Sequence, residues 1–161
     1  MKNLFAGVLA LALLTLSAPA VQGQIDLGPQ LSVAEDVDVG IGVNVVAPLA
    51  TLHENLEFSG NFTFYFPDGV DYWEVDGDVR YLFPIPDNTS ILPFAMAGLA
   101  IGYYSWDAGI HDGSETELGL RLGGGFKVPM DNLTPFLELG LGVGDIPDFT
   151  LRGGLTFPLG G

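Results

Sequence analysis

Apolar and polar side chains alternate along most of the chain, and this period of two residues is the feature that most limits its fold. In residues 55–67, NLEFSGNFTFYFP, every second residue from Leu56 to Phe66 is apolar or glycine. The residues between them are Glu57, Ser59, Asn61, Thr63 and Tyr65. Successive side chains of a β-strand point to opposite faces, whereas a helix repeats every 3.6 residues. The segment is therefore predicted to be a strand with one apolar and one polar face.

The same alternation recurs along the chain. It is clear in residues 37–46, 73–83, 118–127, 136–143 and 149–157, and weaker in two further segments. Residues 25–33 alternate but contain Pro29, and residues 92–104 are apolar on both faces, so their orientation is left open. Turn-forming sequences separate the segments, among them PDG at 67–69, PIPDN at 84–88 and HDG at 111–113. These segments predict an all-β fold, an eight-stranded antiparallel up-and-down β-barrel.

The N-terminus carries a separate signal. Lys2 is followed by the apolar run 4–16 and by small residues that include Ala18 and Ala20. This order is typical of a secretory signal peptide, and the run is shorter than the roughly 20 residues of a membrane-spanning helix. We predict a signal peptide over residues 1–23, cleaved after Ala20 or Gly23, and a single barrel domain over 24–161. A retained anchor helix is the alternative.

The charge balance excludes several classes of function. The chain has 20 acidic residues and five Lys or Arg residues, of which Lys2 leaves with the signal peptide, so the mature charge is 4 − 20 = −16. Nucleic-acid binding needs clustered basic residues, and it is therefore not expected. The chain has no cysteine, which excludes disulfides, thiol chemistry and cysteine-rich zinc sites.

The distribution of charge along the strands predicts which face points inward. A soluble barrel has apolar residues inside, whereas a transmembrane barrel has them outside, facing lipid. All basic residues of the mature chain fall on polar strand faces, together with seven acidic residues, and charges confined to an interior must be paired. We predict a transmembrane barrel with a lumenal charge network made of Arg80, Arg121, Lys127, Arg152, Asp38, Glu57, Glu74, Asp76, Asp78, Glu117 and Glu138.

Glycine and aromatic residues support the same orientation. The polar faces are rich in glycine, which weakens a strand and so indicates close packing in a narrow lumen. Aromatic residues gather near strand ends, where amphipathic rings meet the two interfaces of a bilayer. The predicted girdles are Phe66, Trp73, Tyr103 and Phe149 at the outer rim, and Phe83, Phe126 and Phe157 at the inner rim.

Two alternatives to a plugged structural barrel remain open. The predicted lumen has seven acidic and four basic residues. This surplus of negative charge would make a narrow, water-filled pore prefer cations. A secreted lipocalin-like barrel would bind an apolar ligand inside, although large aromatic side chains on every strand would overpack it.

Catalytic and metal sites are not expected. His53 and His111 fall in predicted turns at opposite ends of the barrel, and only His111 has a serine nearby, Ser105 or Ser114. The chain is therefore predicted not to be an enzyme and to need no cofactor. Asp76 and Asp78 lie on a strand rather than in a coordinating loop, and the acidic residues of the outer turns indicate a solvated surface, so no metal site is predicted.

In its pattern the mature chain resembles the small outer-membrane β-barrels of the OmpA-like and OmpX-like type. The resemblance implies a monomer in the outer membrane of a Gram-negative-type bacterium, surrounded by lipid, with a structural or surface-exposed role. The segment RGGLTFPL, residues 152–159, resembles the barrel-assembly signal of this class through Gly154, Phe157 and Leu159. That likeness implies contact of the C-terminal strand with the barrel-assembly machinery. Pro158 and the Leu-Gly-Gly ending depart from the pattern.

Overall fold

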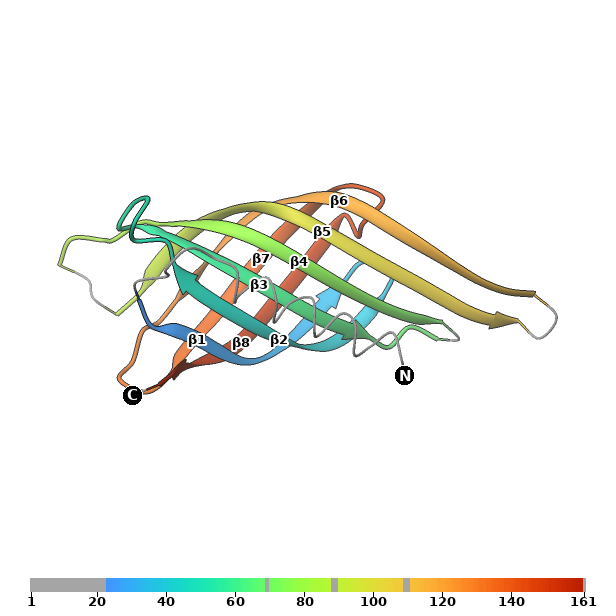
Figure 1. The fold of residues 1–161 in the computed structure, drawn as a ribbon, viewed down its shortest axis with the longest axis horizontal. Helices are drawn as coiled ribbons and strands as arrows, with labels where there is room; N and C mark the ends of the chain where they lie inside the picture. The colour runs from blue at the N-terminus through green and yellow to red at the C-terminus, as the bar shows by residue number, and fades with distance from the viewer. Residues whose placement is uncertain (1–22, 69, 88–89, 109–110, 161) are drawn as a thin grey trace.

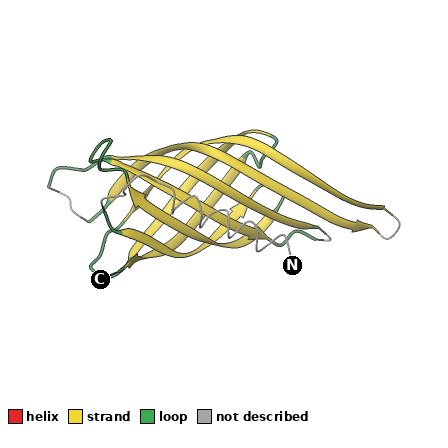
Figure 2. Ribbon diagram, in the orientation of Figure 1, coloured by secondary structure: helices red, strands yellow, loops and turns green. Residues whose placement is uncertain are grey.

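Eight antiparallel strands form one closed barrel in chain order, and β8 pairs with β1 to complete it (Figures 1 and 2). The computed structural model describes residues 23–68, 70–87, 90–108 and 111–160; all of the expected signal peptide except Gly23 falls outside these ranges. The strands are β1 (Ile25–Ala34), β2 (Asp38–Pro48), β3 (Leu56–Tyr65), β4 (Asp71–Leu82), β5 (Leu92–Ala108), β6 (His111–Lys127), β7 (Thr134–Gly144) and β8 (Phe149–Leu159). The predicted eight-stranded up-and-down barrel is confirmed.

The two faces of the wall have opposite character. On β1, Leu31 and Val33 are 62% and 49% exposed, whereas the alternate residues Gln30 and Ser32 are buried. The other strands follow the same rule, and most of the large exposed hydrophobic residues belong to strands. The apolar residues therefore form the outside of the barrel and the polar residues the inside. The lipocalin-like alternative with an apolar interior is wrong.

The β5–β6 hairpin is longer than the sequence pattern predicted. β5 extends to Ala108 instead of 104, and HDG at 111–113 lies in β6 rather than in a turn. The ladder between these strands runs out to Ala108↔His111, whereas β4 stops pairing with β5 at Ser105. The hairpin thus projects beyond its neighbours at the right of Figure 1. Alternation predicts a strand only where one face contacts an apolar phase, and this part of the hairpin lies beyond the barrel wall.

Inward-facing glycines allow neighbouring strands to approach closely. A Cβ at Gly123 would lie 2.0 Å from the carbonyl oxygen of Leu139, and one at Gly125 would lie 2.1 Å from that of Leu137. The obstacle is the backbone of β7, so no side-chain movement could make room. These glycines are needed for the close approach of two strands in the wall of a narrow barrel.

The ladder that closes the barrel is interrupted at a proline. Pairs between β1 and β8 run from Ile25↔Leu159 to Leu27↔Phe157 and resume at Gln30↔Gly154. The Glu35 amide donates to the Phe149 carbonyl at 3.0 Å, and every second pair of an antiparallel ladder is hydrogen-bonded in this way. Counting along this register places Pro29 opposite Leu155 in a hydrogen-bonded position. Because proline has no N–H, Pro29 cannot donate to Leu155.

Replacing Pro29 with valine should restore this hydrogen bond. We expect the free energy of unfolding to rise by about 1 kcal/mol, measured by denaturant titration of the refolded barrel. Pro158→Val is the matched control, because Pro158 lies opposite Asp26 in a non-hydrogen-bonded position and should gain nothing. Equal stability of the two variants would contradict this explanation of the interrupted ladder.

Candidate functional site

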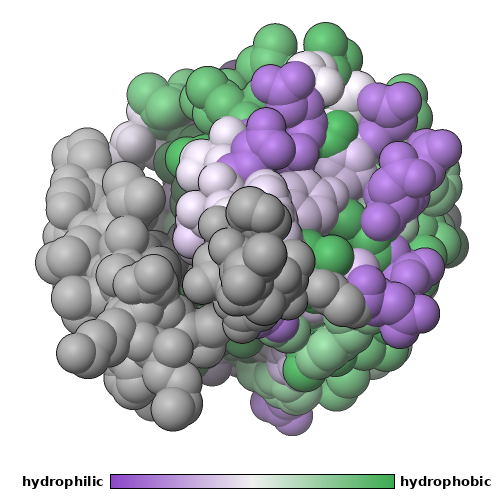
Figure 3. Space-filling model, turned by 90° about the vertical axis from the view of Figure 1, so that its right-hand side faces the viewer, coloured by the Kyte–Doolittle hydropathy of each residue, from purple (hydrophilic) through white to green (hydrophobic). Residues whose placement is uncertain are grey.

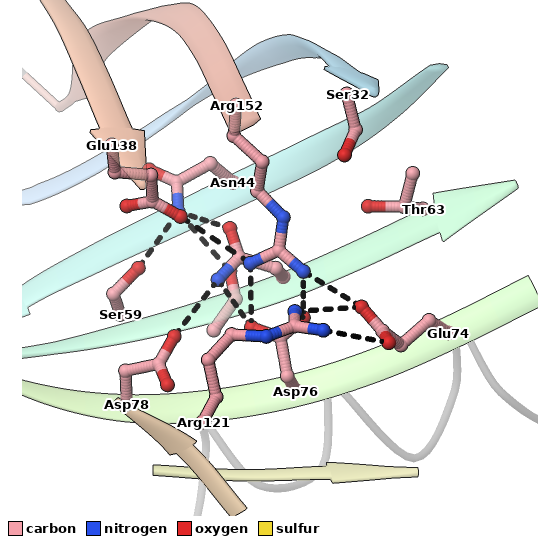
Figure 4. A network of polar contacts seen from close by, with 12 residues as sticks. Ser32, Asn44, Ser59, Thr63, Glu74, Asp76, Asp78, Arg121, Glu138 and Arg152 are labelled. Atoms are coloured by element: carbon pink, nitrogen blue, oxygen red, sulfur yellow. Dashed lines mark hydrogen bonds and ion pairs between the residues drawn. The ribbon is translucent and has the colours of Figure 1, made fainter. Parts of the chain in front are cut away.

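The centre of the lumen holds a network of ion pairs between opposite walls (Figure 4). Nη1 and Nη2 of Arg121 donate to Oε1 and Oε2 of Glu74 at 2.7 and 2.9 Å, and Nη1 also lies 3.2 Å from Asp76. Arg152 donates from Nη2 to Glu74 at 2.8 Å and from Nη1 to Asp76 at 3.0 Å. Two guanidinium groups and two carboxylates therefore form one continuous cluster.

The strand geometry explains why these four residues meet. Glu74 and Asp76 are two residues apart on β4, so both side chains point into the lumen. Arg121 reaches them from β6 and Arg152 from β8. All four are at most 2% exposed. A charge buried without a partner is strongly unfavourable, and the mutual pairing in this cluster offsets that cost.

A second group of charges closes the end of the lumen near the C-terminus. Arg80 pairs with Glu138 and lies 3.6 Å from Glu57, which also pairs with Lys127. Glu138 links this group to the central cluster, because its Oε1 lies 3.3 Å from Nη1 of Arg152.

Aromatic rings pack around this second group. The Arg80 guanidinium carbon lies 4.7 Å from the ring centre of Phe94 and 5.7 Å from that of Phe136, a cation–π arrangement. Both phenylalanines are buried, as is Met96 on the same face of β5. Side chains therefore fill the lumen at this end.

Tyrosines fill the opposite end, from which the β5–β6 hairpin projects. The ring centres of Tyr65 and Tyr72 are 5.4 Å apart, and Tyr72 stacks on Tyr104 at 4.1 Å. Val37, from the turn between β1 and β2, packs with these rings and is fully buried. Ile146, from the turn between β7 and β8, is also buried. Two turns thus contribute apolar side chains to the closure of this end of the lumen.

The structure brings most of the predicted lumenal residues together, but not all of them. Arg80, Arg121, Lys127, Arg152, Glu57, Glu74, Asp76 and Glu138 take part in the ion pairs described above. Asp78 is buried beside them and makes no ion pair with a described residue.

Asp38 corrects the prediction, and Glu117 takes no part in the described ion pairs. Asp38 is the first residue of β2, but it is exposed and has a φ of 62°, so it lies at the end of the strand and not among the buried lumenal charges. Its place in the alternating pattern was misleading because this first residue of the strand has a left-handed backbone conformation, which alternation does not predict. Glu117 lies on β6, past the point where this strand stops pairing with β7. Its side chain is half-buried and forms no ion pair within the described part of the chain.

The aromatic side chains predicted as girdles all lie on the outer face, exposed or half-buried. They are Phe66, Trp73, Phe83, Tyr103, Phe126, Phe149 and Phe157. Trp73 stacks on Tyr103 with ring centres 5.2 Å apart. Near the other rim, Tyr81 contacts Phe83 edge-to-face at 5.1 Å, and the His53 ring lies 5.7 Å from that of Tyr81. Aromatic contacts thus occur on the outer face toward both ends of the wall.

Other kinds of site find little support in the described part of the chain. It contains no group of three or more His, Cys, Asp or Glu residues that could hold a metal ion. Within the same residues, no helix has the length and apolar character needed to cross a membrane.

Comparisons with known proteins support the fold through structure alone. The sequence matches no known protein family and no curated protein. The structure is similar to the N-terminal β-barrel domain of Pseudomonas aeruginosa OprF, with a TM-score of 0.69 and 17% identity over 86% of this chain and 98% of that one. It is also similar to Ail, the attachment invasion locus protein of Yersinia pestis, with a TM-score of 0.60 and 16% identity over 84% and 97% of the chains.

A third similar structure is Neisserial surface protein A, with a TM-score of 0.58 and 15% identity over 84% of this chain and 95% of that one. The fold is therefore that of the small eight-stranded outer-membrane β-barrels, as the resemblance in the sequence implied.

Proposed function

We propose that the mature chain is an integral outer-membrane β-barrel with a sealed lumen and a structural or surface-exposed role, without catalysis. One observation carries the proposal: charged side chains fill the interior while the exterior is apolar. Lipid is then the main contact of the wall, and the chain functions as a monomer exported by its signal peptide. The C-terminal strand, β8, would contact the assembly machinery.

The exterior supports a location in lipid. Leu99, Leu118 and Leu120 on adjacent strands are 57%, 60% and 52% exposed, and comparable residues occur on the other strands. Soluble monomers rarely expose apolar patches of more than a few hundred Å². An apolar band around a barrel with a polar interior is typical of outer-membrane proteins.

The outer end supports a surface-exposed role. Figure 3 views the end from which the β5–β6 hairpin projects, and hydrophilic residues gather there with hydrophobic residues around the margin. Glu35, Asp36 and Glu115 are exposed near this end, while all four described cations point into the lumen. This end would therefore present a polar, anionic surface. The fold shared with Ail, named for attachment and invasion, is compatible with contact at the cell surface.

Single-channel recording distinguishes the sealed barrel from the narrow pore. We expect no conductance from the mature chain in planar bilayers, because Arg80 with two phenylalanines and the tyrosine layer fill the two ends of the lumen. Insertion would be verified in the same preparation by resistance of the barrel to protease. Stable cation-selective current from the inserted protein would favour the pore and refute the sealed lumen.

A further inference from the structure

Asp78 is exceptional among the carboxylates of the lumen. Glu57, Glu74, Asp76 and Glu138 each form at least one ion pair, and together they face Arg80, Arg121, Lys127 and Arg152. Four ion-paired carboxylates thus balance four cations. Asp78 is a fifth carboxylate, 0% exposed, and is in no ion pair with a described residue.

The hydrogen bonds of Asp78 do not stabilise an anion. Its Oδ2 accepts one long hydrogen bond from the Asn61 amide at 3.4 Å, and its Oδ1 has no described donor. The same Asn61 amide donates to Asp76 at 2.7 Å, and Asp76 in addition contacts both Arg121 and Arg152. Two carboxylates on one face of β4 therefore have opposite surroundings.

One oxygen of Asp78 is enclosed by the backbone of the neighbouring strand β5. A Cβ built on Gly98 of β5 would lie only 2.2 Å from Oδ1 of Asp78, so the backbone of β5 covers this oxygen. Charged groups near Asp78 are Asp76 and Arg80 on its own strand and Glu57 on β3, whereas its β5 neighbours Met96, Gly98 and Ala100 are uncharged. Across the lumen lie Arg121, Glu138 and Arg152, whose guanidinium and carboxylate groups already pair with one another or with other partners.

We propose that Asp78 is a proton-binding site, which holds one proton in the folded barrel at neutral pH and so leaves the balance of the buried ion-pair network at four cations and four carboxylates. A carboxyl group kept neutral by an enclosed site is an established response to burial without a partner. This inference rests on the sealed lumen of the proposed function, because water entering an open lumen could solvate an ionised Asp78.

A bound proton makes folding depend on pH in a defined direction. An unfolded chain ionises an aspartic acid above about pH 4, so at neutral pH the folded barrel holds one proton more than the unfolded chain. The contribution of Asp78 to stability is therefore full at acid pH and decreases as pH rises. One proton changes the unfolding equilibrium constant about tenfold for each pH unit.

The test compares Asp78→Asn with the wild-type mature chain by denaturant titration in lipid vesicles from pH 4.5 to 8. Asparagine imitates a protonated carboxyl and needs no proton. We expect the variant to be more stable than the wild type at pH 7. The ratio of the wild-type unfolding equilibrium constant to that of the variant should fall about tenfold for each pH unit toward pH 5. The carbonyl stretch of a protonated carboxyl should appear in the infrared spectrum of the wild type at pH 7 and be absent from that of Asp78→Asn.

Asp76→Asn is the matched control, two residues away on the same face. It should raise the unfolding equilibrium constant by roughly a hundredfold or more, because it breaks buried ion pairs. The proposal is overturned if Asp78→Asn destabilises the barrel as Asp76→Asn does, if its advantage is the same at every pH from 5 to 8, or if the infrared band is missing. A conducting channel would refute the proposed function instead, and the pH comparison would still report the state of Asp78.

Discussion

Replacement of Arg152 by methionine should lower the free energy of unfolding by about 3–5 kcal/mol, the range found when a buried ion pair loses one partner. Arg152 contacts Glu74, Asp76 and Glu138, all of them buried. Its loss leaves Arg121 as the only guanidinium between Glu74 and Asp76. The measurement is denaturant titration of the variant and the wild type in the same vesicles.

A double variant separates the loss of charge balance from the loss of packing. Combining Arg152→Met with Asp76→Asn removes one positive and one negative charge, so the double variant should be more stable than the sum of the two single effects predicts. Residues in direct contact commonly show interaction energies of about 0.5–3 kcal/mol. Additive effects, or a stable Arg152→Met single variant, would show that the lumenal ion pairs do not determine the stability of the barrel.

Leu120 lies on the outer face of the barrel wall, and its replacement by arginine should impair insertion into the membrane. Leu120 is 52% exposed on β6, between the equally outward Leu118 and Leu122. A cationic residue in the lipid-facing band destabilises a folded barrel by about 2–4 kcal/mol near the midplane and much less near the interfaces. The expected result is a lower folded fraction in vesicles and a lower free energy of unfolding.

The control for this variant is Leu52→Arg. Leu52 is 74% exposed and lies in the turn between β2 and β3, outside the wall. Leu52→Arg makes the same chemical change at a site exposed to water, so the free energy of unfolding should hardly change. If Leu120→Arg folded as well as Leu52→Arg, the outer face would not be in contact with hydrocarbon.

The strands that separate an apolar from a polar phase were predictable from the sequence. The run from Leu56 to Phe66 alternates because each second side chain faces outward, and the confirmed β3 ends within one residue of it. β5 carries apolar residues on both faces, since Phe94 and Met96 line the lumen while Leu99 and Ile101 are outside. The orientation of β5 follows only from its pairing with β4. The residues of β5 alone do not contain this information.

The ends of the barrel were less predictable than its wall. Val37 begins the alternating segment 37–46 on its apolar face, yet it lies in the turn between β1 and β2 and is buried with the tyrosines. The pairing of Asp76 rather than Asp78 with arginine depends on side chains from β6 and β8. Alternation places both aspartates in the lumen, but it contains no information about which guanidinium reaches across to which carboxylate.

Gel mobility with and without boiling tests the central claim most directly. The mature chain, refolded in lipid vesicles or detergent, would be run beside a sample diluted into plain buffer. A barrel with an apolar exterior and an ion-paired lumen should be soluble only with lipid or detergent and should migrate differently before and after boiling. A chain that stays soluble and compact in plain buffer, with one mobility at both temperatures, would contradict an exterior built for lipid.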